Sequence, residues 1–455
     1  MNRRMLKNQM ATVQKSTSNW RCRISQLTCS ALLLCNTSHA QGTPPQLGPA
    51  KNAIFFIGDG MGIAAITGGR IWKKDSTTPL AMEKLPTLGM VKTYSSSDFV
   101  TDSAASATAL ATGVKTRNGM LSMSDPDLDP SGKSRPLETL FDLAHQAGKS
   151  LGIISTARVT HATPAAFYAH VDDRDKEENI AEQLLDAPLA LLMGGGRQAF
   201  TTTRKDGRDL LKELKQQHWH YVGNRDQLTS LTLKKGEAVL GLFADSHMDY
   251  DLENRLRSPR QPSLTEMVQF AMRYLSTNEK GYVLMVEAGR IDHAAHVNRA
   301  QDLFGDLVAL DEAVAYAEQH KTADTLTVIT ADHETGGLAL NGYKDLPDTK
   351  GDGLLSRSTR TSHPLVTFAT GPGETQGKYQ KPNDMLLFQH PSLYAMESAA
   401  HTAVDVPILA GGPGATAFSG FIDNDDIAPK IAQALGLSFT ATANQQNFKL
   451  LSHKK

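Results

Sequence analysis

Cysteine is nearly absent from this chain of 455 residues, and the three that occur, Cys22, Cys29 and Cys35, lie close to its start. A fold built on a disulfide framework is therefore excluded for the rest of the chain. An excess of basic charge is also missing, because 47 Lys and Arg residues face 48 Asp and Glu residues. This balance is not typical of nucleic-acid binding, so we expect no such partner. Apart from the short apolar run near the start, we find no run of about 20 apolar residues and expect no membrane span.

The beginning of the chain has the pattern of an export signal. Its basic residues, which include Arg3, Arg4 and Lys7, precede a short apolar stretch at residues 24–35, and Ser38 and Ala40 supply the small residues of a cleavage site. We interpret residues 1–40 as a signal peptide and residues 41–50 as a Pro/Gly linker. The alternative is an amphipathic helix that stays on the chain. With the signal peptide removed, acidic residues outnumber basic ones, which suits a periplasmic or secreted protein that holds cations.

Short apolar runs rich in β-branched residues alternate with helical patterns through most of the remaining sequence. Strands are expected at residues 53–57, 151–155, 190–193, 282–286, 326–330 and 406–410. Between them, Ser263 and Glu266 form a capping-box signature, and residues 302–318 repeat apolar side chains at helical spacing. The alternation predicts an α/β fold: a doubly wound, mostly parallel sheet flanked by helices.

One stretch breaks the alternation. Residues 341–398 are rich in Gly, Pro, Lys and Asp, and we expect them to form an inserted irregular subdomain. The sheet pattern then resumes, and a helix is expected near residues 425–437. The catalytic domain is thus predicted to span residues 51–437, followed by a polar C-terminal tail at residues 438–455.

Carboxylates and imidazoles follow the predicted strands, where ligands bind in an open parallel sheet. The glycine-rich turn after the first strand does not keep the spacing of a dinucleotide loop, and its aspartate suits a cation better. Oxygen and nitrogen donors without thiolates fit Zn²⁺ together with a harder ion such as Mg²⁺, and their number implies more than one ion. The donors are Asp59, Glu287, Asp292, His293, His296, Asp332, His333 and His401.

A candidate nucleophile lies at the start of an alanine-rich helical pattern. Either Asp102 or Ser103 would cap this helix, and the unpaired N–H groups of its first turn would attract an anion. A serine hydroxyl is a poor nucleophile unless a base or a metal activates it. Ser103 is therefore a candidate only in combination with the predicted cations.

Taken together, these segments resemble the alkaline phosphatase family. The resemblance covers residues 51–437 and rests on seven motifs in order: IGDGMG at 57–62, VTDSAASATALATG at 100–113, ATPAAF at 162–167, LMGGGR at 192–197, VEAGRIDHAAH at 286–296, TADHETGG at 330–337, and HTAVDVP, which begins at His401. Seven ordered motifs make this a specific match.

The resemblance implies a role for each matching residue. Ser103 would be phosphorylated during turnover, and Arg174 would grip two phosphate oxygens. Two zinc ions and one magnesium ion are implied. One zinc would be held by Asp292, His296 and His401, the other by Asp59, Asp332, His333 and Ser103, and the magnesium by Asp59, Thr163 and Glu287. A homodimer is a further expectation from the family.

Two positions depart from the enterobacterial members, which have an aspartate and a lysine where this chain has His161 and His293. Both are histidine in animal-type members. His161 would bring a nitrogen near the magnesium site and favour Zn²⁺ there instead. His293 would remove a fixed positive charge beside the phosphate site.

The predicted function is a metal-dependent hydrolysis of small phosphomonoesters through a phosphoserine. Two other classes stay open. A related diesterase differs only in the shape of its pocket, whereas a sulfatase would need a Cys/Ser-x-Pro-x-Arg segment, which the residues after Ser103 do not provide. A periplasmic metal-scavenging protein would need neither Ser103 nor Arg174. Hydrolysis of an aryl phosphate monoester, compared with its diester, separates the three.

Overall fold

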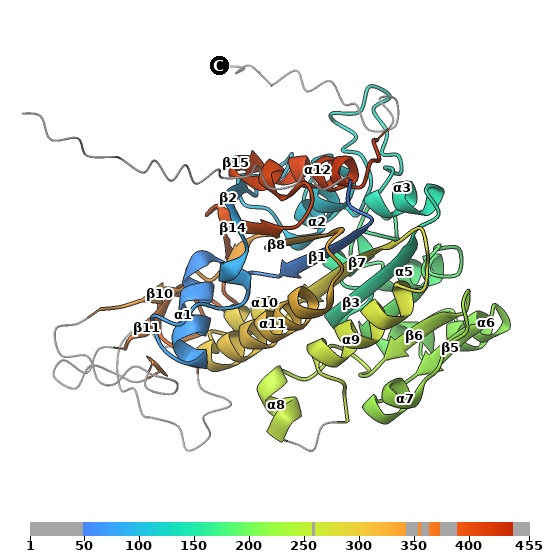
Figure 1. Cartoon of the computed structure of the whole chain (residues 1–455). Coiled ribbons are helices and arrows are strands. Elements are labelled where there is room, and N and C mark those ends of the chain that lie inside the picture. Colours follow the sequence, from blue (N-terminus) through green and yellow to red (C-terminus); the bar gives the residue numbers. More distant parts are fainter. Residues whose placement is uncertain (1–48, 257–259, 343–353, 356–363, 374–388, 440–455) are drawn as a thin grey trace, which may run out of the picture. The chain divides into compact units, whose positions relative to one another are not determined.

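The computed structural model describes residues 49–256, 260–342, 354–355, 364–373 and 389–439. These residues contain one large sheet of ten strands, in the order β15-β2-β14-β8-β1-β7-β3-β4-β6-β5 (Figure 1). Only β14 runs against the others, antiparallel to both β2 and β8. The strands are β1 (Asn52–Gly58), β2 (Thr87–Lys92), β3 (Ser150–Arg158), β4 (Leu191–Gly195), β5 (Trp219–Val222), β6 (Ala238–Leu242), β7 (Tyr282–Ala288), β8 (Thr325–Thr330), β14 (Val406–Gly411) and β15 (Gly420–Asp423).

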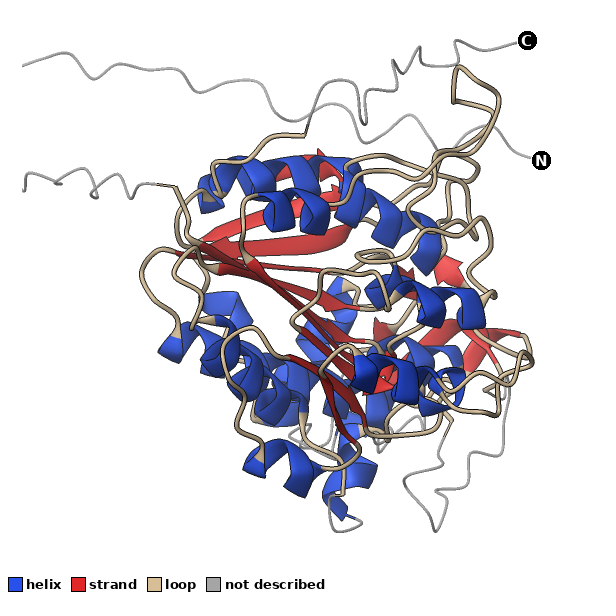
Figure 2. Cartoon of the chain, turned by 90° about the vertical axis from the view of Figure 1, so that its right-hand side faces the viewer, coloured by secondary structure: helices blue, strands red, loops and turns tan. Residues whose placement is uncertain are grey.

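Helices cover both faces of the sheet (Figure 2). On one face α1 and α9 both pack against the long helix α11, and on the other α2, α3 and α12 pack against one another. The helices are α1 (Ile63–Lys73), α2 (Ser103–Thr112), α3 (Leu140–Gln146), α4 (Ala162–Ala165), α5 (Glu177–Gln183), α6 (Leu210–Gln216), α7 (Arg225–Ser230), α8 (Asp251–Leu256), α9 (Leu264–Leu275), α10 (Arg290–His296), α11 (Ala300–His320) and α12 (Ile427–Ala434). The predicted α/β class, with a mostly parallel sheet between helices, is confirmed.

The six strands expected from the sequence all lie in the sheet, as β1, β3, β4, β7, β8 and β14. Helix α9 begins with the predicted capping box, in which Ser263 and Glu266 each bond the other's backbone N–H. None of the helices in the described ranges has the length and apolar character that a bilayer-spanning helix requires.

Residues 341–398 contain some regular structure where they are described. Two strands, β11 (Val366–Gly371) and β12 (Ser392–Ala395), form a three-stranded sheet with β10 (Ala339–Leu340). The segment is thus less irregular than expected in these parts, and its other residues lie largely outside the described ranges. The predicted signal peptide and nearly all of the predicted C-terminal tail also lie outside them.

Candidate active site

The candidate site forms where three neighbouring strands end. Strand β1 lies between β8 and β7, parallel to both, and Ile57 pairs with Glu287 on one side and with Thr330 on the other. The residues that follow these strands therefore meet at one edge of the sheet, as expected for a parallel sheet. This register brings together Asp59, Glu287 and Asp332, which are fully buried.

A first group joins helix α10 to β13 (His401–Thr402). Nε2 of His296 lies 3.2 Å from Oδ2 of Asp292 and 3.2 Å from Nε2 of His401. The other ring nitrogens donate to backbone carbonyls, Nδ1 of His296 to Ala399 at 2.6 Å and Nδ1 of His401 to Thr101 at 3.0 Å. A neutral imidazole that donates through Nδ1 has a lone pair on Nε2. Two lone pairs this close, beside a carboxylate, form a site suited to a cation.

The second group surrounds His333, whose ring is fully buried. Its Nε2 lies 3.1 Å from Oδ2 of Asp332, 3.5 Å from Oδ1 of Asp59 and 3.1 Å from Oγ of Ser103. Both oxygens of Asp59 and Oδ2 of Asp332 are buried without a hydrogen-bond donor. Buried carboxylate oxygens are costly unless a hydrogen bond or a cation compensates them. The donor set and its missing partners fit a bound metal ion.

The third group has Asp59 in common with the second. A ligand atom of His161 lies within 4.8 Å of those of Asp59 and Glu287. Oγ1 of Thr163 and Oε1 of Glu287 are buried without hydrogen-bond partners, as are both oxygens of Asp59. Burial raises the pKa of Glu287 to about 8 and also raises the pKa of Asp59. A positive ion at this point would hold both carboxyl groups in their charged form.

Ser103 is the first residue of α2, and Asp102 is the N-cap. The side chain of Asp102 accepts a hydrogen bond from the backbone N–H of Ala105 at 2.9 Å. This settles which of the two residues caps the helix and leaves the hydroxyl of Ser103 free to face His333. The unpaired N–H groups and dipole of the same helix end favour negative charge at this point.

Arg174 reaches the same helix end. Its Nη1 lies 3.1 Å from Oδ2 of Asp102, which also accepts from the backbone N–H of Gly119 at 3.0 Å. Its Nη2 lies 3.3 Å from Nε2 of His161. The guanidinium is thus held beside Ser103 by a carboxylate that two other groups keep in place.

His161 and His293 lie together, with ring centroids 5.3 Å apart. Burial lowers the pKa of both imidazoles, that of His293 to about 3, so both are uncharged near neutral pH. The structure adds a histidine that the sequence did not single out: the His247 ring lies 4.1 Å from His293 and 5.6 Å from His161. No local motif marks His247, because it reaches the site from a loop far away in the sequence.

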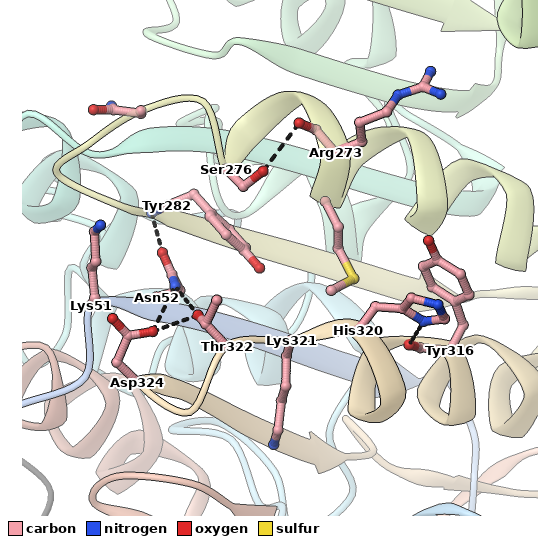
Figure 3. Close-up of a pocket in the computed structure, with 12 residues that line it drawn as sticks. Lys51, Asn52, Arg273, Ser276, Tyr282, Tyr316, His320, Lys321, Thr322 and Asp324 are labelled. Carbon is pink, nitrogen blue, oxygen red and sulfur yellow. Dashed lines mark hydrogen bonds between the residues drawn. The ribbon is translucent and has the colours of Figure 1, made fainter.

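A cavity of about 280 Å³ lies at the opposite edge of the sheet. Its lining includes Asn52, Tyr282 and Asp324, which stand at or next to the amino ends of β1, β7 and β8 (Figure 3). It contains none of the predicted site residues. The groups that contain Asp59, Glu287 and Asp332 lie instead at the carboxyl ends of these three strands.

Comparison with known proteins identifies the family of the chain. The alkaline phosphatase family profile matches residues 50–437. The rat tissue-nonspecific alkaline phosphatase isozyme is 32% identical over 92% of this chain and 89% of its own length. The repressible alkaline phosphatase of Saccharomyces cerevisiae is 39% identical over 69% of this chain and 61% of its own length.

Solved structures lead to the same family. The alkaline phosphatase of the Antarctic bacterium TAB5 superimposes with a TM-score of 0.68 and 27% identity, over 87% of this chain and all of that one. The Thermus thermophilus enzyme gives a TM-score of 0.69 and 28% identity, over 90% and 97% of the two chains. The family match, these relatives and these structures identify the chain as a phosphatase, a hydrolase of phosphate esters. The chain belongs to the alkaline phosphatase family.

Proposed function

We propose that this phosphatase hydrolyses small phosphomonoesters in two steps through a phosphoserine at Ser103. The observation that carries the proposal is the position of the Ser103 hydroxyl, at the N-terminus of α2 and 3.1 Å from Nε2 of His333. In the first step Oγ attacks phosphorus and the alcohol leaves. In the second, water attacks the same phosphorus, releases inorganic phosphate and restores the serine. The fork of Arg174 holds two phosphate oxygens through both steps.

We assign the three groups of donors to three cations. Asp292, His296 and His401 would hold one zinc ion, and Asp59, Asp332, His333 and Ser103 the other. Asp59, Thr163 and Glu287 would hold magnesium, or zinc if His161 contributes its nitrogen. Bound at these positions, such ions act as Lewis acids, lower the pKa of a coordinated hydroxyl and stabilise the charge of a leaving oxygen.

The identity of the third ion depends on the histidine beside it. Two solved variants of the Antarctic enzyme, in which a histidine is replaced by aspartate or glutamate, are described with magnesium bound. In this chain His161 stands next to Asp59 and Glu287, so it offers a nitrogen where a hard ion prefers oxygen. We infer that the native third site takes zinc more readily than a site with a carboxylate would.

The boundaries and the setting of the enzyme are also proposals. We assign residues 1–40 to a signal peptide, residues 41–50 to a linker and residues 51–437 to the catalytic domain, and we place the protein in the periplasm or outside the cell. We further propose a homodimer. Mass spectrometry of the exported protein tests the cleavage site, and light scattering after size-exclusion chromatography tests the dimer.

The test of the function compares the hydrolysis of an aryl phosphate monoester with that of its diester, in the parent and in Ser103→Ala. We expect the parent to prefer the monoester and the variant to lose that activity. Preferential cleavage of the diester would favour a diesterase. Metal binding without turnover of either ester would favour a scavenging protein.

A further inference from the structure

The motif at residues 192–197 has so far no role in the site. It forms the end of β4 and a tight turn, in which Gly196 has a left-handed φ of 98°. A methyl group at Gly195 would meet the carbonyl oxygen of Ser246 at 2.1 Å. The backbone N–H of Gly196 donates to this same carbonyl at 2.7 Å. The loop after β6 therefore lies directly on the turn, and glycine is what lets it come so close.

This approach brings His247 to the active site. Its ring meets His293 edge to face at a centroid distance of 4.1 Å, and it contacts His161 at 5.6 Å. The backbone N–H of Met248 donates to Thr156 in β3 at 3.1 Å and fixes the loop on the other side of the histidine. The three imidazoles thus form one cluster beside Asp59 and Glu287.

Arg158 anchors His247 in the loop. The guanidinium of Arg158 contacts Nε2 of His247, and its backbone N–H lies 3.3 Å from Nδ1. The same guanidinium donates to both carboxylate oxygens of Glu177, at 2.9 and 2.7 Å, and Thr160 donates to that carboxylate at 2.7 Å. A neutral ring can accept from one of these two N–H donors and a protonated ring from neither, so the contacts with Arg158 favour the neutral form. Neutral rings can pack closely without repulsion.

The other two imidazoles have an arginine neighbour as well. Nη2 of Arg174 lies 3.3 Å from Nε2 of His161, and Nη1 of Arg290 lies 3.0 Å from Nδ1 of His293. His161 lies near Asp59 and Glu287 and next to Arg174. His247 has ring contacts with His161 and His293 and a contact with Arg158. Its influence on the site must therefore pass through His161 and His293.

We propose that His247 is a positioning residue of the third cation site: it packs against His161 and His293 and holds their rings in the orientation that the ion requires. The turn at residues 194–196 serves to admit the loop that carries it. This inference rests on the proposed third cation site. Groups that orient the ligands of a metal typically contribute about 10- to 100-fold to its affinity, which sets the size of the expected effect.

The experiment measures the affinity of the third site directly. Mg²⁺, and separately Zn²⁺, is titrated into protein whose two proposed zinc sites are already filled, and bound ion is counted by native mass spectrometry. We expect His247→Ala to weaken binding of the third ion by about tenfold or more, and an excess of that ion to restore turnover. His247→Phe, which keeps the ring but cannot accept from Arg158, should fall between the parent and His247→Ala.

A second variant tests the affinity of the same cation site without changing His247. In Gly195→Ala the new methyl group pushes the loop away, so we expect a loss of third-ion affinity like that of His247→Ala. Gly342→Ala is the matched control, because a methyl group there meets no neighbouring atom and its backbone is not left-handed. His145→Ala, at an exposed histidine on α3, controls for loss of an imidazole.

Glu287→Gln separates the inference from the proposed function. If this variant loses the third ion while His247→Ala and Gly195→Ala bind it like the parent, the positioning role of His247 is refuted and the cation site stands. If Glu287→Gln also binds the third ion like the parent, the assigned site itself is wrong, and the inference falls with it.

Discussion

Ser103 Oγ lies 3.1 Å from Nε2 of His333, on the side of the ring that also faces the carboxylates of Asp59 and Asp332. Thr335 donates to Asp292 at 2.6 Å, so its oxygen accepts from Nδ1 of His333 at 3.2 Å. The proton of the neutral ring is thus on Nδ1, and Nε2 carries a lone pair. That lone pair faces Ser103 and two carboxylates, which is the environment of a metal ligand more than that of a general base.

The first prediction concerns Ser103→Ala. Without the hydroxyl no phosphoserine can form, so we expect the loss of covalent phosphate and of most turnover, while metal binding and fold are kept. Labelled substrate is mixed with enzyme, the reaction is quenched in acid, and protein-bound label is counted.

The control is Ser106→Ala, one turn further along α2. The Ser106 hydroxyl donates to the backbone carbonyl of Asp332 at 2.7 Å, so its loss should destabilise the protein by about 1 kcal/mol and leave the label in place. Label retained by Ser103→Ala would assign the covalent step to another residue.

Removing Arg174 should weaken the binding of phosphate. Hydrogen bonds to charged groups contribute about 1.5–3 kcal/mol each, so we expect Arg174→Ala to raise the inhibition constant of phosphate by about tenfold or more. Arg174→Lys should recover only part of this, because an ammonium group is not a planar fork. Arg225→Ala, which breaks the ion pair between Arg225 on α7 and Glu266 on α9, is the control and should leave the constant unchanged. Equal constants in all four proteins would remove Arg174 from the phosphate site.

Chelation should lower stability as well as activity. Ions that bind only the folded state stabilise it by mass action, by about 4 kcal/mol for each ion at a thousand times its Kd. Without them, Asp59, Glu287, Asp292 and Asp332 remain buried together. We expect the melting temperature to fall after treatment with a chelator and to recover when zinc and magnesium are returned. An unchanged melting temperature would contradict a structural contribution of the ions.

Titration of Glu287 should make the metal-free protein less stable as the pH rises. The pKa of Glu287 is raised from 4.5 to about 8, so between these values the unfolded chain has released a proton that the folded chain keeps. Deprotonation then favours unfolding, by up to about 1.4 kcal/mol per pH unit for such a group. The raised pKa of Asp59 acts in the same direction.

Thermal unfolding of the chelated protein, measured between about pH 5 and pH 8, checks this. The free energy of unfolding depends on Glu287 only between the pKa of this residue in the unfolded chain and its pKa in the folded chain. Glu287→Gln has no such proton, so the parent should lose stability relative to this variant as the pH rises. Once cations compensate the carboxylates, this contribution to the slope should disappear. Identical slopes for the chelated parent and the chelated variant would show that Glu287 does not titrate in this range.

The central strands of the sheet could be predicted from the sequence because both of their faces are buried. Strands β1, β7 and β8 are buried at every residue, so each reads as a short run dominated by apolar and β-branched residues. The strands missed were β2, β5, β6 and β15, which are short and lie toward the two sides of the sheet. In β2 buried and exposed residues alternate around a glycine, which weakens its apolar signal.

The site was predictable to the extent that it is local. Asp59, Glu287 and Asp332 stand at the carboxyl ends of adjacent strands, and this position marks them in the sequence. His247 could not be found in that way. The position of His247 depends on a contact between the turn at Gly195 and the loop that contains Ser246, which lie about fifty residues apart in the chain. The motif around Gly195 does not indicate which segment contacts it.

The last prediction concerns the double variant His161→Asp and His293→Lys. Aspartate supplies a hard oxygen next to Asp59 and Glu287 in place of a nitrogen, so Mg²⁺ should occupy the third site more fully. Both native imidazoles are uncharged near neutral pH, because burial lowers their pKa. The new lysine therefore adds a positive charge that holds phosphate more tightly and slows its release.

We expect the double variant to bind more magnesium, to be inhibited by less phosphate and to reach its highest rate at a lower pH. The measurements are metal analysis of the purified protein, phosphate inhibition constants and pH–rate profiles of both proteins. The two single variants separate these changes. His161→Asp should account for the higher magnesium content, and His293→Lys should account for the stronger inhibition by phosphate. If the double variant matched the parent in all three measurements, the histidines would only fill space beside the site.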